Sequence, residues 1–266
     1  MVHQEDTMQA PTLRPYRSRN GSIRRPLLIV AGLVLLAILA AGGYGLWYLF
    51  LQPPGPAAVA DSSLPPVPTS AATGSSQPVA SGGIDGTWNV DTSIGSFADS
   101  TSSFVGYRVQ EELASIGAST AVGRTPNVSG SLTISGTQVT AATITADLTA
   151  LESDDQRRDG QLARQGIQTS QFPTATFKLT APIDLGSVPA DGKEIQVTAT
   201  GQLTLHGQTK DVQIPLKARL SGSTIAISGS LPIAFADYGI QKPNSFMVLS
   251  IADEGTMELQ LFFTRA

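Results

Sequence analysis

The pattern of apolar and polar residues divides the chain into regions with different periods. Residues 27–51 form an unbroken apolar run without a charged residue, whereas residues 52–83 show no regular period. From residue 84 onward, apolar and polar residues alternate with a period of two. This period is typical of β-strands that bury one face. The sequence therefore predicts one β-domain over residues 84–266, preceded by an apolar helix and a linker.

The alternation is clearest over residues 194–206 and residues 212–220, which are separated by a turn that begins at His206. The two segments predict a hairpin with one apolar face. Pro215 falls on the polar side of the second segment and has no N–H to donate, which favours a sheet edge or a bulge there. The apolar set is made of Ile195, Val197, Ala199, Leu203, Leu205, Val212, Ile214, Leu216, Ala218 and Leu220.

Shorter alternating runs recur along the domain and predict about eight to ten antiparallel strands, as in a barrel or a sandwich. A run of thirteen residues at ~3.3 Å per residue spans ~43 Å, which favours strands that coil around a barrel. We expect an extended, lipocalin-like antiparallel barrel of about eight strands, whose small apolar wall residues leave room for a slender chain. The further runs are residues 87–92, 103–109, 128–134, 140–148, 174–180, 224–235, 246–251 and 256–264.

Two segments interrupt the strand pattern. Residues 154–165 are charged and contain no β-branched residue, which predicts a short helix. Residues 111–125 are expected to form an inserted loop. The charges around the predicted helix lack the glycine and terminal glutamate of a calcium loop, so solvated or salt-bridged side chains are favoured over a metal site. These charged residues are Glu152, Asp154, Asp155, Asp159, Arg157 and Arg158.

The apolar run over residues 27–51 is long enough for a membrane span. Its 25 residues would make a helix of ~37 Å, against ~30 Å of hydrocarbon. Five arginines precede the run and no comparable cluster follows it, which predicts a single-pass segment with a basic cytoplasmic tail over residues 1–26. A secretory signal cleaved near residues 58–60 is the alternative, although its apolar core would usually be only ~7–15 residues long. The arginines are Arg14, Arg17, Arg19, Arg24 and Arg25.

The linker over residues 52–83 is rich in Pro, Ala, Ser and Gly, with Asp61 as its one charged residue. Such a composition buries too little apolar surface to offset the entropy of ordering. We therefore expect a solvated tether that holds the β-domain outside the cytoplasmic membrane.

Composition removes several classes of function. The chain has no cysteine, so disulfides, thiolate nucleophiles and a lipoprotein acyl anchor are excluded. From residue 84 there are twelve basic and eighteen acidic residues, so nucleic acid is not an expected partner. His206 is the one histidine of the β-domain, and a structural hydrogen bond is its expected role. We expect no enzymatic activity, no cofactor and no metal.

Five motifs in the domain occur in an order that resembles the YceI-like family of bacterial, mostly exported, lipid-binding proteins. The resemblance implies an eight-stranded barrel whose elongated cavity takes a polyisoprenoid, such as a quinone or a polyprenol. Gln161 stands where the family motif has a histidine, and Thr92-Ser93 replaces a His-Ser pair, so no role of those histidines is carried over. The motifs are Trp-Asn-Val-Asp at 88–91, Arg-Asp-Gly-Gln-Leu at 158–162, Phe-Pro-Thr-Ala-Thr-Phe at 172–177, Leu-Thr-Leu-His-Gly-Gln-Thr-Lys at 203–210 and Phe-Ala-Asp-Tyr-Gly-Ile at 235–240.

Aromatic residues are the candidates for the wall or the mouth of the cavity, because the domain has few other large side chains. The expected function is a membrane-tethered protein that holds an apolar chain for sequestration or transport. The alternative is a protein-interaction module whose barrel is filled by its own side chains. The candidate ligand-binding residues are Phe104, Tyr107, Phe172, Phe177, Phe235, Tyr238 and Phe246.

Overall fold

The structure of the chain is a computed structural model that describes residues 24–50, 56–59, 64, 83–114, 117–244 and 248–266. The chain separates into two compact units, Met1–Gln52 and Pro53–Ala266.

The first unit contains one long helix, α1 (Arg24–Phe50). The apolar side chains described on it, such as Ile29 and Leu33, are exposed. The predicted helical structure of residues 27–51 is therefore confirmed as far as Phe50. Among the described residues, however, no helix combines the length and the hydropathy that a membrane crossing requires, and the predicted membrane span is not supported.

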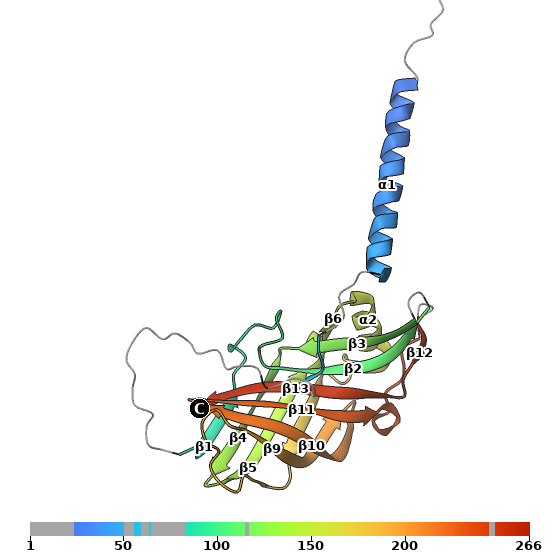
Figure 1. The fold of residues 1–266 in the computed structure, drawn as a ribbon. Helices are drawn as coiled ribbons and strands as arrows, with labels where there is room; N and C mark the ends of the chain where they lie inside the picture. Colours follow the sequence, from blue (N-terminus) through green and yellow to red (C-terminus); the bar gives the residue numbers. More distant parts are fainter. Residues whose placement is uncertain (1–23, 51–55, 60–63, 65–82, 115–116, 245–247) are drawn as a thin grey trace, which may run out of the picture. The chain divides into compact units, whose positions relative to one another are not determined.

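The second unit is an all-β domain with a closed barrel. Eight strands pair in the ring order β1-β4-β5-β7-β9-β10-β11-β13, and β13 closes the ring on β1 through the pair Trp88↔Arg265. Every pair in the ring is antiparallel, as Figure 1 lets the reader follow. The ring strands are β1 (Gly86–Val90), β4 (Val128–Ser135), β5 (Gln138–Asp147), β7 (Thr174–Leu179), β9 (Glu194–Leu205), β10 (Gln208–Ser221), β11 (Thr224–Ala234) and β13 (Glu254–Arg265). The predicted barrel of about eight strands is confirmed.

Further strands and short helices lie outside the ring. β2 (Phe104–Leu113) pairs with the first half of β13 and with β12 (Val248–Ile251), and β3 (Gly117–Thr125) and β6 (Glu152–Ser153) follow β2. Beside them lie α2 and its continuation η3 (Figure 1). The remaining elements are α2 (Gln156–Gln161), η2 (Leu148–Ala150), η3 (Leu162–Gly166), η4 (Phe235–Tyr238) and β8 (Ile183–Asp184).

The hairpin of β9 and β10 forms as the alternation predicted. Leu205 pairs with Gln208 at its closed end, and both intervening residues have positive φ, 51° at His206 and 72° at Gly207. Positive φ at both central residues is the requirement of a type I′ turn, which matches the twist of the flanking strands. The ladder between β10 and β11 stops at Leu216, so Pro215 lies just beyond it, where no N–H is needed.

Two sequence predictions for interrupted segments had different outcomes. The predicted helix is confirmed as α2, which begins with the Asp155 side chain accepting a hydrogen bond from the N–H of Arg157. The predicted loop over residues 111–125 is wrong, because most of it belongs to the hairpin of β2 and β3. Small residues in β3 hide the alternation, and one of them, Gly123, lies directly under the ring of Tyr107.

The linker also differs from its prediction in part. We call residues 56–59 together with Leu64 the strap, because they lie against the outer wall of the barrel. Val59 and Leu64 are only 6 % and 3 % exposed, so these two residues of the predicted tether are not solvated, whereas Pro56 and Ala57 are exposed. The neighbouring residues 51–55, 60–63 and 65–82 lie outside the described part of the chain.

Candidate functional site

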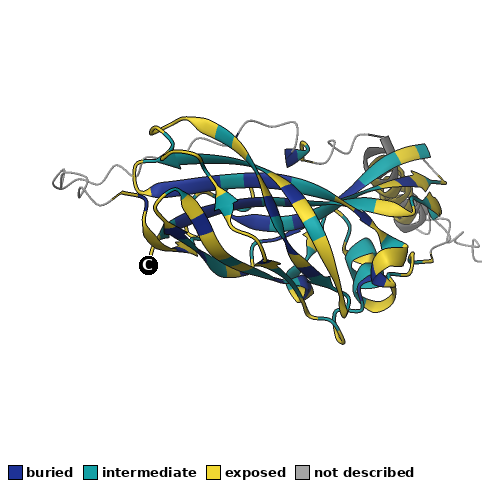
Figure 2. Ribbon diagram, turned by 90° about the horizontal axis from the view of Figure 1, so that it is seen from below, coloured by how far each residue is buried: buried dark blue, intermediate teal, exposed yellow. Residues whose placement is uncertain are grey.

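The candidate site is the interior of the barrel, which the alternating residues of the ring strands line. Figure 2 shows buried and exposed residues mixed along the strands; less and more exposed residues alternate along β9, whereas β11 and β13 carry runs of consecutive buried residues. The residues that sequence analysis placed on the apolar side of β9 and β10, such as Val197 and Leu216, do point inward. Three of them, Ala199, Leu216 and Leu220, belong to the main hydrophobic core together with Leu132 and Phe263.

This core is hollow. The barrel encloses an apolar cavity of about 140 Å³. One water needs roughly 10–15 Å³, and apolar cavities of ~150 Å³ stay dry and take up small apolar molecules. Described residues leave this space open, so the barrel is not filled by its own side chains. The premise of the interaction-module alternative is therefore not met.

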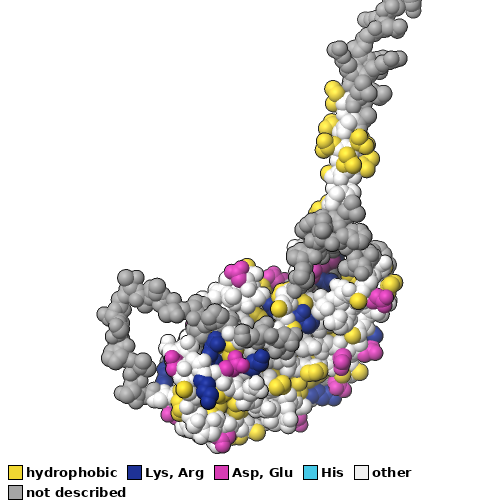
Figure 3. Space-filling model, viewed as in Figure 1, with side chains coloured by type: hydrophobic (Ala, Val, Ile, Leu, Met, Phe, Trp, Pro, Cys, Tyr) yellow, Lys and Arg dark blue, Asp and Glu magenta, His cyan; other side chains and the backbone are white. Residues whose placement is uncertain are grey.

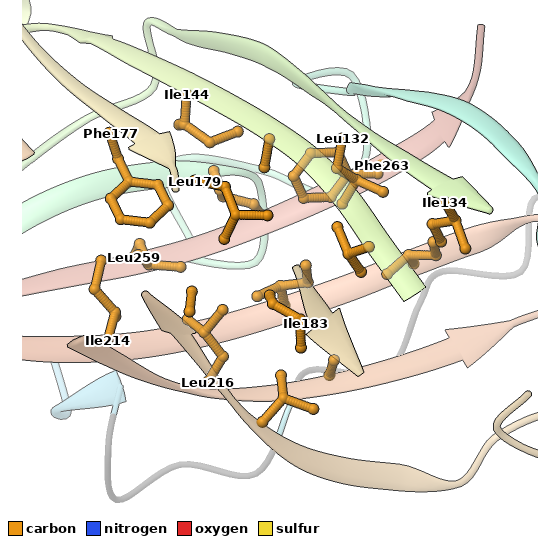
Figure 4. Close-up of a pocket in the computed structure, with 18 of the residues that line it drawn as sticks. Leu132, Ile134, Ile144, Phe177, Leu179, Ile183, Ile214, Leu216, Leu259 and Phe263 are labelled. Atoms are coloured by element: carbon orange, nitrogen blue, oxygen red, sulfur yellow. The ribbon is translucent and has the colours of Figure 1, made fainter. Parts of the chain in front are cut away.

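The side chains around the cavity come from every ring strand except β1 and converge on one elongated space, as Figure 4 shows. Phe177 and Ile214 lie towards one end in this view, Ile183 lies between the ends, and Ile134 lies towards the other end. Of the 28 residues around the cavity, every one except Arg219 has an apolar side chain. They are Ile84, Val105, Leu132, Ile134, Val139, Ala142, Ile144, Ala146, Ala175, Phe177, Leu179, Ile183, Leu185, Pro189, Ile195, Val197, Ala199, Leu203, Ile214, Leu216, Ala218, Arg219, Leu220, Ile225, Ile227, Leu259, Leu261 and Phe263.

Small residues keep the space open. Five of the lining residues are alanines, among them Ala142 on β5 and Ala199 on β9. The ring of Phe177 lies over Gly201, where even a Cβ atom would collide with it. Because Gly201 has no side chain, the aromatic ring of Phe177 on β7 can pack against the backbone of β9. A larger residue at any of these positions would reduce the volume available to a ligand.

Arg219 does not bring a charge into the cavity. It lies between the inward-facing Ala218 and Leu220 on β10, and its Nη2 donates to the carbonyl oxygen of Leu64 on the outer side at 3.3 Å. On the face drawn in Figure 3, by contrast, Lys and Arg lie among Asp and Glu. The cavity can therefore bind an apolar group by burial, while a charged group would lose its hydration there without a partner.

The structure brings one of the predicted aromatic residues to the cavity wall, namely Phe177. Phe104 is on the outward side of β2, under the guanidinium of Arg124 at 4.2 Å. Tyr107 faces inward but packs over Gly123, outside the cavity lining. Phe246 lies outside the described residues. The ligand-binding roles of all these residues stay predictions.

The other three aromatic residues gather around the turn of the β9–β10 hairpin and around η4. The ring of Phe172 is 4.4 Å from that of His206. Tyr238 is buried against Leu203, and Phe235 packs beside Gly255. They belong to the end of the barrel beyond the described cavity lining.

His206 has the structural role that the sequence predicted. Its Nδ1 is 2.9 Å from the carbonyl oxygen of Tyr238, so this nitrogen carries the proton and donates it. Its Nε2 is buried and has no hydrogen-bond partner among the described residues. Asp211 bonds to Gln202 instead, so it is not an acid placed against His206.

The charges around α2 form ion pairs, as predicted. Arg158 bridges Asp154 at 2.5 Å and Glu111 on β2 at 2.7 Å. Asp159 accepts hydrogen bonds from the backbone and the side chain of Ser153. Within the described residues, no group of three or more His, Cys, Asp or Glu side chains is placed to hold a metal ion.

Sequence analysis missed two parts of the site. The first is the segment in and after β8, for which the sequence predicted no strand. It contributes the lining residues Ile183, Leu185 and Pro189. The alternation of Ile183 and Leu185 was a weak signal of an inward face. The buried position of Glu111 was also missed, because residues 111–125 were interpreted as a loop.

Two solved structures are similar to this chain. A polyisoprenoid-binding domain from Saccharophagus degradans, implicated in plant cell wall breakdown, superimposes with a TM-score of 0.52 at 19 % identity, over 68 % of this chain and 99 % of that domain. BcnA of Burkholderia cenocepacia matches at a TM-score of 0.46 and 21 % identity, over 59 % of this chain and 95 % of BcnA.

Sequence comparison gives curated relatives of the same type. A UPF0312 protein of Vibrio cholerae serotype O1 is 28 % identical over 124 residues, 43 % of this chain. The match spans 62 % of the length of that relative. The model of the YceI-like domain matches residues 97–263, well over half of the chain. The chain therefore belongs to the YceI-like family.

Proposed function

We propose that the barrel binds a polyisoprenoid or a similar long apolar chain, such as that of a quinone or a polyprenol. The observation that carries this proposal is the elongated cavity, in which all lining side chains but one are apolar. Burial of apolar surface supplies roughly 25 cal/mol per Å², so a chain that replaces the empty space gains affinity along its whole buried length.

Binding of this kind makes and breaks no bond. The cavity lining offers no charged group to an inserted ligand, so a polar head would remain outside the apolar part of the barrel. The similarity to the domain from Saccharophagus degradans, which is described as polyisoprenoid-binding, supports the choice of ligand class. Sequestration or transport of the chain is the function that follows.

The ligand can be sought directly. The purified protein is extracted with organic solvent, the extract is analysed by mass spectrometry, and the lipid-free protein is titrated with prenols and quinones of increasing chain length. We expect a bound lipid or saturable binding that strengthens with chain length until the cavity is full. The proposal would be contradicted if no lipid co-purified and the protein took up none of the added prenols or quinones.

A matched pair of variants locates the binding site. Ala199 faces the cavity and Thr198, its neighbour on β9, faces outward. Ala199→Trp should fill the cavity and reduce prenol affinity at least tenfold, whereas Thr198→Trp should leave it unchanged. Circular dichroism of both variants checks that each still folds, and Ala142→Phe on β5 provides a second cavity-filling change. Equal affinity in all three variants would place the ligand elsewhere.

We further propose that residues 27–51 hold the domain at the outer face of a cell membrane, with the N-terminus in the cytoplasm. The uncharged run and the five preceding arginines support this arrangement. The protein should then stay with the membrane fraction after alkaline washing, and added protease should reach the barrel from outside the cell. Release by alkaline washing would exclude the anchor, and protection from the protease would reverse the orientation.

A further inference from the structure

The outer wall of the barrel over β13 is buried by other parts of the chain. Glu258, Gln260 and Phe262 point outward from β13, yet they are 1 %, 7 % and 0 % exposed. The Gln260 side chain donates to the carbonyl oxygens of Ser100 and Ser102, at 3.1 and 2.8 Å. The loop that contains Ser100 and Ser102 covers only one part of the wall. The strap covers another.

The strap is held to the wall through its backbone. Arg108 Nη2 donates to the carbonyl oxygen of Pro56 at 2.7 Å, and Arg124 Nη2 donates to that of Ala57 at 3.2 Å. The N–H of Val59 donates to Glu258 Oε1 at 3.1 Å. These contacts, like that between Arg219 and the carbonyl of Leu64, involve backbone atoms of the strap, which do not depend on the identity of its side chains.

Two aliphatic side chains of the strap add apolar contact. Leu64 packs against Ala226 of β11 and Phe262 of β13, with Ile94 beside them. Val59 is buried as well. Side chains thus fix the position of the strap along the wall, and its backbone supplies the polar contacts.

The charges beneath the strap are arranged to receive such a backbone. Glu258 accepts from Arg108 Nε at 3.1 Å and pairs with Arg124 Nη2 at 3.5 Å, so two guanidinium groups face one carboxylate. Arg124 is only 6 % exposed, and this burial lowers the pKa of its guanidinium. The Nε of Arg124 also has no partner among the described residues. Carbonyl oxygens of the strap supply acceptors that Glu258 alone does not provide.

We propose that the outer wall over β13 is a peptide-binding groove, built from Arg108, Arg124 and Glu258, whose ligand is the strap of the same chain. The strap is bound as a peptide ligand would be, and the covalent connection through residues 65–82 is not what holds it in place. The barrel is therefore attached to the upstream part of the chain by a peptide complex as well as by the main chain.

Cutting the connection tests this proposal on the full chain. A specific protease site is placed within residues 65–82, the folded protein is cleaved in detergent, and the two fragments are separated by size-exclusion chromatography. We expect the fragment that carries the strap to co-elute with the barrel. Fragments that separate at once under these conditions would overturn the proposal.

Two substitutions at one position test how the strap is recognised. Val59→Pro removes the N–H that Glu258 accepts, whereas Val59→Ala keeps it and shortens the side chain. After cleavage we expect the fragment with proline to dissociate about tenfold faster, or more, than the fragment with alanine, because hydrogen bonds to charged groups are strong. Thermal unfolding of the uncleaved variants shows that the barrel itself is intact. Equal dissociation of the two variants would contradict recognition through the backbone.

The oligomeric state identifies the chain that supplies the strap. The uncleaved protein with a strap bound in its own groove should be monomeric at concentrations where the cleaved fragments remain associated. A dimer that exchanges straps between differently tagged copies would overturn the assignment to the same chain, because the groove would then hold the strap of a second copy.

Discussion

The two faces of β13 border regions of opposite character. Leu259, Leu261 and Phe263 point into the barrel and border a cavity. Glu258 and Phe262 point outward, where side chains and the strap fill the space. Both faces are buried, but the inner face is apolar and leaves room, whereas the outer face is mixed, charged and closely packed.

The difference separates two uses of a buried surface. On the outer face each charge has partners within the chain, and these contacts contribute to the stability of the folded domain. On the inner face the apolar side chains have incomplete contact with one another, so some of the possible packing energy is not realised until a ligand enters. One strand therefore serves folding with one face and binding with the other.

Among the substitutions that compare the two faces, replacing Glu258 should reduce the free energy of unfolding the most. Glu258→Ala leaves Arg108 and Arg124 without their carboxylate in a buried environment, and we expect the free energy of unfolding to fall by about 3–5 kcal/mol. Urea denaturation measures the loss. The exposed Glu254 on the same strand provides the control, and Glu254→Ala should change stability by about 0.5 kcal/mol or less. A similar small change for Glu258→Ala would mean that the outer cluster adds nothing to stability.

Enlarging one alanine on each face gives an intermediate effect. Ala226 faces the outer wall and Ala199 faces the cavity, and they are equally buried at 1 % and 2 % exposure. Ala226→Leu should overpack the contact with Leu64 and cost about 1–3 kcal/mol. Ala199→Leu should change stability by less than about 1 kcal/mol, because its added methyl groups enter empty space. Thermal unfolding compares them, and equal losses would show that the cavity does not accept added volume.

The sequence predicted the inner face better than the outer one. Alternation along β9 and β10 placed most of the inward residues correctly, because a period of two follows directly from strand geometry. The same rule assigns Glu258 and Gln260 to solvent. It separates the two faces of a strand by polarity, but it does not predict which segment of the chain covers the outer face. Their burial depends on the strap, which is distant in sequence and has the composition of a solvated linker.

The candidate site was predicted as a class but not residue by residue. The small apolar wall residues favoured a barrel with room for a ligand but left a self-filled barrel open, and the structure shows the apolar cavity. Aromatic side chains were nevertheless favoured as its lining, and among the six described residues of that set only Phe177 reaches the cavity. The reason is their place in the fold. Phe172 and Tyr238 pack around the hairpin turn and η4, and Phe104 lies on the outer side of β2. These positions depend on tertiary contacts that periodicity does not record.

The smallest expected change in stability comes from Tyr107, an inward-facing residue that carries a polar group. Its hydroxyl is buried and has no hydrogen-bond partner among the described residues. Burial raises the pKa of Tyr107 far above its usual range, in spite of the nearby positive charge of Arg158. A buried polar group without a partner is unfavourable, so Tyr107→Phe should raise the free energy of unfolding at neutral pH by about 1 kcal/mol.

The pH dependence of stability checks the cause. Unfolded tyrosine loses its proton at about pH 10, while folded Tyr107 keeps it to higher pH because its pKa is raised. The contribution of this group is therefore complete below about pH 10 and is lost as the pH rises above that value. Urea denaturation of both proteins should give a constant difference near neutral pH and a shallower alkaline decline for Tyr107→Phe. Parallel alkaline declines would mean that the pKa of Tyr107 is not raised in the folded protein. A loss of stability at neutral pH would mean that the hydroxyl has a hydrogen-bond partner.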